Sequence, residues 1–243
     1  MLSQPDRQMT VYVYAIIDRP TIPVPDMPGL EGAALDTLPC QDIGAVVSLS
    51  TVGKAPPVEA ILWQHETVVE ALMADHSVLP VRFGTMLPDE AAVQAVLVTH
   101  YAEFTVGLER VRGHVELGLR VLWNDDSARP LTSDQPPPHS LGSGRAYMLA
   151  RLEEECRLQV RRERAESLAR EIHTPLARLA AEATLRTLMT PRLLLTAAYL
   201  VRHEQVAAFR QEVETLSPTY PEVRLLCTGP WPPFSFVAVR NEL

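Results

Sequence analysis

Cysteine is scarce in this 243-residue sequence, which contains only Cys40, Cys156 and Cys227, far apart. No pair of them has the spacing of metal ligands, and an odd number does not suit the disulfide framework of a small secreted protein. We therefore interpret all three as small buried apolar groups in a reducing compartment. The N-terminal residues MLSQPDRQMT lack the apolar segment of a signal peptide, so a cytoplasmic location is expected.

Long apolar runs and lysine are scarce as well. The longest aliphatic run, Leu193 to Val201, is far shorter than the roughly 20 residues needed to cross a bilayer, so no membrane association is expected. Lys54 is the single lysine among 22 basic residues. Residues 1–130 carry 8 Lys and Arg against 17 Asp and Glu, and residues 131–243 carry 14 against 13. Because the acidic first half repels phosphate backbones, the sequence predicts no nucleic-acid partner.

The composition, 47% hydrophobic and 21% charged, is that of a folded globular protein. The chain length suits about two domains. Residues Asn124–Gly144 contain four prolines together with Asp, Ser and Gly, a mixture typical of a linker. The boundary is therefore placed there, with an N-terminal domain over residues 1–130 and a C-terminal domain over 131–243. The second domain opens with a long helix and ends in a tail of prolines and aromatics.

Hydrophobic periodicity predicts the order of helices and strands. In the first half, the alternating and helical patterns predict strands at Thr10–Ile17, Ile43–Ser50 and His114–Trp123, helices at Val58–Ala74 and Asp89–Arg112, and an apolar connection at Ser77–Leu87. In the second half they predict a helix from Ser143 that Pro175 kinks or splits, strands at Ala183–Met189, Arg192–Arg202 and Glu222–Thr228, and a helix at His203–Leu216. This order favours the α+β class, with two ferredoxin-like domains that each back a small, mainly antiparallel sheet with helices.

Motifs for catalysis or metal binding are largely missing. His65-Glu66 resembles the start of a zinc protease motif, but Val69 stands where the second histidine is required. His65 lies on the apolar face of its helix and is interpreted as a hydrogen-bonded core histidine, although Asp75 and His76 offer further ligands for a loosely spaced metal site. The turn Gly142–Arg145 opens a helix, where Ser143 suits a cap better than a phosphate site. No catalytic, cofactor-binding or metal-binding residue is therefore predicted.

The tail, Gly229 to Val237, joins three prolines to three aromatic residues. Prolines fix φ and stiffen the segment, so the aromatic side chains are buried or presented at low entropic cost. Two interpretations stay open: the aromatics cap the core of the second domain, or they form a rigid apolar contact surface. The candidate partner-contact residues are Trp231, Phe234 and Phe236.

The tail sequence CTGPWPPFSFV, preceded by EVRLLC, resembles the C-terminal signature of the gas vesicle F/L family (GvpF/GvpL-like). Further stretches follow the order found in that family, namely YVYAII, HETVVEAL followed by VLPVRFGTML, VELGLRVLW, and GSGRAYMLARLE at the start of the long helix. The resemblance extends from Val11 to Val237. It implies two domains related to the ferredoxin-like type. It carries no catalytic residues, and it implies an architectural role for Arg82, Phe83, Gly84, Gly142, Gly144, Tyr147 and the tail aromatics.

Members of the family are accessory proteins of gas vesicles, the gas-filled protein shells that give some microbes buoyancy. The resemblance therefore implies a non-enzymatic accessory or minor structural protein of the gas vesicle within the cytoplasm. Its expected partners are the hydrophobic major shell protein and other gas vesicle accessory proteins, and no cofactor is expected. The alternative is a small-molecule or metal-binding enzyme or regulator that uses a ferredoxin-like cleft, with the His65, Asp75 and His76 group or the Gly142–Arg145 turn as its site.

Overall fold

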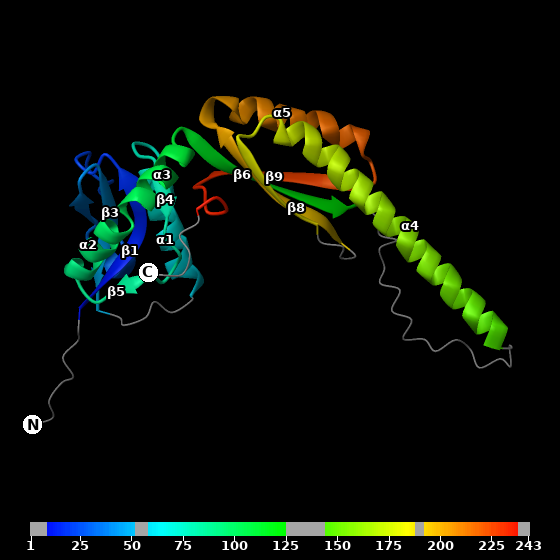
Figure 1. Ribbon diagram of the computed structural model, residues 1–243, viewed down its shortest axis with the longest axis horizontal. Helices are drawn as coiled ribbons and strands as arrows, with labels where there is room; N and C mark the ends of the chain where they lie inside the picture. Colours follow the sequence, from blue (N-terminus) through cyan, green and yellow to red (C-terminus); the bar gives the residue numbers. More distant parts are fainter. Residues whose placement is uncertain (1–8, 52–57, 125–143, 188–191, 238–243) are drawn as a thin grey trace, which may run out of the picture. The chain divides into compact units, whose positions relative to one another are not determined.

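The computed structural model describes residues 9–51, 58–124, 144–187 and 192–237 (Figure 1). The chain divides into two compact units. Unit 1 comprises residues 1–116 and 231–243, and unit 2 comprises residues 117–230. The boundary expected at residue 130 falls outside the described residues, and the observed division runs between Glu116 and Leu117 instead. The C-terminal tail was expected in the second domain, but from Trp231 onward it belongs to unit 1.

Unit 1 contains an antiparallel sheet of five strands in the order β2-β3-β1-β4, with β5 also paired to β1. Its strands are β1 (Thr10–Asp18), β2 (Asp36–Cys40), β3 (Ile43–Ser50), β4 (Val78–Pro80) and β5 (Met86–Leu87), and its helices are α1 (Glu59–Leu72), α2 (Glu90–Thr99) and α3 (Tyr101–Val111). The predicted strands around β1 and β3 and the helix around α1 are confirmed. The connection expected at Ser77–Leu87 contains the two short strands β4 and β5.

The central strand β1 is buried on both faces of this sheet. Val11, Val13 and Ile16 pack into the core that α2 and α3 cover, whereas Tyr12 and its neighbours Tyr14, Ala15 and Ile17 pack into the core that α1 covers. Tyr14 and Ala15 both face the α1 side, so the alternation of side chains is interrupted there. The interruption coincides with a register shift between Val13 and Ala15 in the pairing of β1 with β3. A bulge of this kind turns one extra residue toward the α1 side. Two separate apolar clusters therefore share one strand.

The prediction of a single helix over Asp89–Arg112 is wrong, because α2 and α3 are separate helices that meet at His100. The backbone of His100 leaves helical geometry, with φ −105° and ψ 16°. Leu97 and Phe104 both remain buried against the same sheet. Their spacing of two helical turns also fits one straight helix, so the apolar pattern does not reveal the break.

Unit 2 has the element order β-α-β-β-α-β and the strand order β7-β8-β6-β9. Its elements are β6 (His114–Trp123), α4 (Gly144–Ala177), β7 (Glu182–Thr187), β8 (Leu193–Arg202), α5 (Val206–Leu216) and β9 (Val223–Trp231), with a 3-10 turn at His203–Gln205 before α5. This is the ferredoxin-like arrangement. When His114–Trp123 is counted with the first half, the second half lacks its first strand, so the sequence prediction shows only α-β-β-α-β there. The predicted α+β class, with antiparallel sheets backed by helices, is confirmed.

Helix α4 packs with α5 against the sheet of unit 2 through its C-terminal half alone (Figure 1). Leu168, Ile172 and Leu176 are fully buried there, and the helix continues past Pro175 to its end at Ala177. The N-terminal half extends beyond the sheet, and its apolar side chains are exposed at Tyr147, Met148, Leu149, Leu152, Leu158 and Val160. One continuous helix thus has a core half and a solvated half.

This division of α4 predicts a large loss of stability from a Leu→Ala substitution in its buried half and almost none in its exposed half. Leu168→Ala removes a side chain with 0% exposure, so the free energy of unfolding should fall by about 2–5 kcal/mol. Leu158→Ala, at a position 55% exposed, should change it by less than about 0.5 kcal/mol. Urea denaturation followed by circular dichroism measures both. Equal losses for the two variants would contradict the described packing of α4.

Candidate functional site

The tail, Gly229 to Val237, overlaps the end of β9, which ends at Trp231, and it contains the three aromatic residues predicted as contacts. Trp231 is 40% exposed and Phe234 is 42% exposed, which is high for such large apolar side chains. Phe236 is only 5% exposed, so its ring is buried and is not available to a partner. The exposed aromatic surface of the tail therefore consists of Trp231 and Phe234, with Phe236 as an internal anchor.

Two charged side chains of unit 1 hold the tail in place. The Glu116 carboxylate accepts hydrogen bonds from the backbone N–H and the hydroxyl of Ser235, each at 2.7 Å. The Arg110 guanidinium donates to the backbone carbonyl of Phe236 at 3.1 Å. Within the segment, the N–H of Phe234 also donates to the carbonyl of Pro232 at 2.7 Å. These bonds fix the backbone on both sides of Phe234.

The prolines between the two exposed rings are themselves buried. Pro232 and Pro233 are buried, whereas Trp231, Phe234 and Ser235 are exposed. Because proline has a fixed φ, the two rings are held without a large loss of conformational entropy when they meet another surface. Aromatic rings on a preformed support are typical of the residues that dominate protein–protein binding energy. The tail turn is therefore a candidate interaction surface, here defined by Trp231 and Phe234.

A second polar group of interest lies inside unit 1, between β1 and α1. The hydroxyl of Tyr12 lies 2.9 Å from Nδ1 of His65 and accepts a hydrogen bond from the N–H of Gly84 at 3.1 Å. The hydroxyl of Tyr14 lies 2.9 Å from that of Ser48 and accepts from the N–H of Leu30 at 2.7 Å. Both tyrosines have no exposed surface, so neither forms the exposed aromatic platform that single-stranded RNA binding needs.

Burial shifts the titration of this group away from neutrality. It lowers the pKa of His65 from 6.5 to about 4, an effect that the backbone of Val81 partly offsets. Burial also raises the pKa of Tyr12 to about 12, against the opposing hydrogen bond from Gly84. His65 is therefore neutral and Tyr12 protonated at physiological pH. The interpretation of His65 as a hydrogen-bonded core histidine agrees with these contacts.

Three of the sequence stretches quoted above meet at this core. YVYAII supplies Tyr12 and Tyr14, HETVVEAL supplies His65, and VLPVRFGTML supplies Phe83 and Gly84. The Phe83 ring lies perpendicular to the His65 ring at 5.7 Å between centroids, and the Tyr14 ring stacks on the His65 ring at 5.7 Å. Gly84 has φ +85°, a conformation that glycine adopts without strain. These contacts are those of a packed core, in agreement with the architectural role that the resemblance implies for Phe83 and Gly84.

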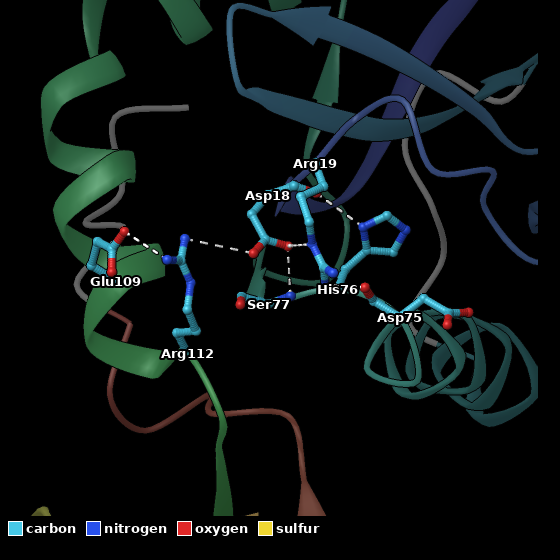
Figure 2. A network of polar contacts seen from close by, with 7 residues as sticks. All are labelled: Asp18, Arg19, Asp75, His76, Ser77, Glu109 and Arg112. Atoms are coloured by element: carbon cyan, nitrogen blue, oxygen red, sulfur yellow. Dashed lines mark hydrogen bonds and ion pairs between the residues drawn. The ribbon is translucent and has the colours of Figure 1, made fainter.

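A network of charged groups surrounds Asp18 at the end of β1, as Figure 2 shows. The nearly buried carboxylate accepts from the N–H of Ser77 at 2.8 Å and lies 3.5 Å from Arg19 and 3.7 Å from Arg112. Arg112 also pairs with Glu109 at 2.9 Å. Asp18 thus ties the end of β1 to the start of β4 and to the end of α3, with its charge balanced by two guanidinium groups.

The structure does not assemble the alternative metal site from His65, Asp75 and His76. Nδ1 of His76 lies 2.9 Å from the carbonyl of Asp18 (Figure 2), whereas Nδ1 of His65 lies 2.9 Å from the hydroxyl of Tyr12. The backbone carbonyl of Asp75 accepts a hydrogen bond from Arg19, and the Asp75 carboxylate points away from the His76 ring. Among the residues that the structure describes, no three His, Cys, Asp or Glu side chains form a group that could hold a metal ion.

The other proposed positions give less information about function. Gly142 and Ser143 of the candidate phosphate turn lie outside the described residues, and Tyr147 is exposed on α4. Arg82 is exposed, and its carbonyl accepts the hydroxyl and the N–H of Thr85. In the described ranges, no helix combines the length and apolarity needed to span a membrane.

The roles of Glu116 and Arg110 as supports of the tail are not predicted from the sequence. Glu116 lies on the polar face of an alternating strand, where a solvated carboxylate is the ordinary expectation. Its partner Ser235 is 119 residues away in the sequence. No local sequence pattern predicts a contact over this distance, so it is seen only in the structure.

The lowered pKa of His65 predicts an acid-sensitive fold. Because protonation is disfavoured in the folded state, the contribution of His65 is complete above pH 6.5 and is lost as the pH falls from 6.5 toward 4. The loss should reach on the order of 3 kcal/mol. His65→Gln should lower stability at neutral pH and flatten the profile, whereas His203→Gln, at an exposed position, should leave it unchanged. Urea denaturation at a series of pH values gives the profile, and an unchanged slope in His65→Gln would contradict the assignment.

Known proteins similar to this chain belong to one group. The family model described as "Gas vesicle synthesis protein GvpL/GvpF" matches residues 10–238. Gas vesicle protein L of Streptomyces sp. (strain CB03234) is 33% identical over 186 residues, which cover 73% of this chain and 69% of that protein. Gas vesicle protein F1 of Halobacterium salinarum is 24% identical over 234 residues, which cover 95% of this chain and 93% of that protein.

Solved structures with the same fold carry the same family name. The crystal structure of the gas vesicle protein GvpF from Anabaena sp. PCC7120 matches with a TM-score of 0.77 and 23% identity, covering 95% of this chain and 97% of that one. GvpF from Microcystis aeruginosa matches with a TM-score of 0.72 and 21% identity, covering 94% and 98%. The match of the family model over nearly the whole chain places the sequence in one family. This chain belongs to the GvpL/GvpF family of gas vesicle synthesis proteins.

Proposed function

We propose that this chain is a non-enzymatic accessory or minor structural protein of the gas vesicle, which assists assembly of the shell by binding the hydrophobic major shell protein. In this role it works in the cytoplasm, at the growing vesicle, together with other gas vesicle accessory proteins. Membership of the GvpL/GvpF family supports the setting. The observation that carries the binding step is the tail turn, where Trp231 and Phe234 are exposed on a clamped backbone.

The tail turn suits an apolar partner for physical reasons. Two large rings on one short segment offer apolar area that becomes favourable when water leaves it. Several polar atoms of the segment already have partners, because Glu116 accepts from Ser235 and Arg110 donates to the carbonyl of Phe236. Contact with an apolar surface therefore leaves few unpaired polar groups behind. A small, very hydrophobic shell subunit fits this requirement.

The tail turn belongs to an acidic unit. Residues 1–130, which contain most of the unit, carry a net charge of −9 from 8 basic and 17 acidic side chains. Net charge of one sign keeps a protein soluble while it holds an apolar partner. An apolar contact embedded in an acidic unit is therefore suited to transient holding of aggregation-prone subunits. The metal-binding alternative has no supporting cluster among the described residues.

The proposal predicts that the two exposed rings carry much of the affinity for the shell protein. The double variant Trp231→Ala/Phe234→Ala should lower retention of co-expressed major shell protein at least roughly tenfold, since exposed aromatic anchors commonly contribute more than about 1 kcal/mol each. Affinity purification with quantification of the bound shell protein measures this, and vesicle yield in cells gives a second measurement.

A matched control exists in the same unit. Trp63 lies on α1, is 57% exposed and donates to Glu59. Trp63→Ala removes a comparable exposed ring from another surface, so it should leave retention of the shell protein unchanged. Full retention by the double tail variant, or an equal loss with Trp63→Ala, would contradict the role of the tail turn.

The clamp gives an independent prediction that leaves both rings in place. Glu116→Ala removes both hydrogen bonds to Ser235, so the turn becomes mobile and ordering it costs free energy on binding. Retention of the shell protein should fall several-fold, roughly as expected for about 1 kcal/mol of lost preorganisation. Hydrogen exchange at the N–H of Ser235 should accelerate in the same variant. Faster exchange with unchanged retention would show that the fixed conformation is not needed.

A further inference from the structure

The outer strands of the two sheets differ in how their edges are protected. An unpaired edge offers free N–H and C=O groups to another strand, and proteins block it with proline, short strands, charges or covering side chains. In unit 1, β2 contains Pro39, whose carbonyl accepts from Gln94 at 3.0 Å. On the opposite side β4 has three residues, all buried, and ends at Pro80. Both edges are therefore obstructed.

The edges of the unit 2 sheet are unequal. Strand β9 contains Pro230, which has no N–H to donate, and the carbonyl of the preceding Gly229 accepts from Arg210. Strand β7 has six residues and no proline. Its side chains from Ala183 to Arg186 are all exposed, and Leu185 alone has 41% of its surface open to solvent. Of the described edges, β7 is the one suited to accept a further strand.

The sequence of β7, EATLRT, is complementary to itself when two copies run antiparallel. If Thr184 faces Thr184 of a second copy, Glu182 faces Arg186 and Ala183 faces Leu185, each pair occurring twice. Opposite charges, apolar pairs and Thr–Thr pairs directly across an antiparallel ladder are all stabilising. A shift by one residue loses both charge pairs, so the sequence favours this register.

We propose that β7 pairs with β7 of a second copy of this chain, in a two-fold symmetric antiparallel arrangement centred on Thr184. The two sheets of unit 2 then form one continuous sheet. A two-fold interface of this kind uses the same surface on both partners, as the self-complementary charges require. The strand is short, so the contact area is small and the dimer is weak and concentration-dependent. The inference concerns a surface separate from the tail turn, and it needs no shell protein.

Charge reversal in the full chain tests the arrangement. Arg186→Glu turns two attractive pairs into two repulsive ones, so the dimer dissociation constant should rise at least roughly tenfold in sedimentation equilibrium. The double variant Glu182→Arg/Arg186→Glu recreates both pairs in reverse and should restore dimerisation. Arg224→Glu changes the net charge equally at an exposed position on β9, and it should have no effect.

A cross-linking experiment tests the register without depending on charge. In a Cys156→Ser background, which removes the exposed native thiol, Thr184→Cys places two thiols across the proposed axis. The Cα atoms of directly opposed residues lie about 4.5–5.5 Å apart, within the reach of a disulfide. A disulfide-linked dimer should therefore form on mild oxidation, whereas Arg224→Cys in the same background should give none.

Several results would overturn the proposal. These are a wild-type chain that stays monomeric at all concentrations, equal effects of Arg186→Glu and Arg224→Glu, or a double charge variant that does not recover. Cross-linking of Thr184→Cys to co-expressed shell protein and not to a second copy would assign the β7 edge to a different partner. Because dimerisation is measured on the chain alone, failure here leaves the proposed binding of the shell protein untouched.

Discussion

Burying β1 on both faces places the hydroxyl groups of Tyr12 and Tyr14 in the interior, and much of unit 1 is arranged around their need for partners. His65 on α1 and the N–H of Gly84 serve Tyr12, and Ser48 and the N–H of Leu30 serve Tyr14. These contacts connect β1 to α1, to the neighbouring strand β3, to the 3-10 turn at Leu30–Gly32 and to the loop at Gly84. An unpaired hydroxyl at either position would cost more than its hydrogen bond contributes, so the network specifies how these segments pack.

Hydrogen bonds also fix the tail, but there they leave two aromatic rings exposed and do not pack a core. Glu116 accepts from the N–H of Ser235 and Arg110 donates to the carbonyl of Phe236, whose ring is buried. The fixed segment then leaves Trp231 and Phe234 partly exposed. A flexible segment with the same sequence would bury these rings against the nearest apolar surface. Clamping the backbone thus keeps apolar area in solvent, which is the physical requirement for a surface that binds hydrophobic subunits.

Sequence reasoning succeeds here where the interactions are local and periodic. The alternation of His114–Trp123 predicts β6 within its observed bounds, and the apolar face of Val58–Ala74 places His65 in the core. It fails where a pattern fits two geometries, as with the kink at His100, or where the partners are distant, as with Glu116 and Ser235. The domain division escapes it for a related reason: composition marks the proline-rich segment after Trp123, whereas the contacts of β6 assign that strand largely to unit 2.

The two proposed association surfaces, the β7 edge and the tail turn, would have a joint consequence for assembly. A six-residue strand edge and a two-ring turn are each too small for a tight complex on their own. Linking them changes this, because once one surface is engaged the second binds at a high effective concentration. A pair of chains joined through β7, as we propose, would carry two tail turns, so it would hold neighbouring apolar subunits more strongly than a single chain. Weak individual contacts would then bind an ordered array of subunits in preference to isolated ones, which is the behaviour that the proposed assembly role requires.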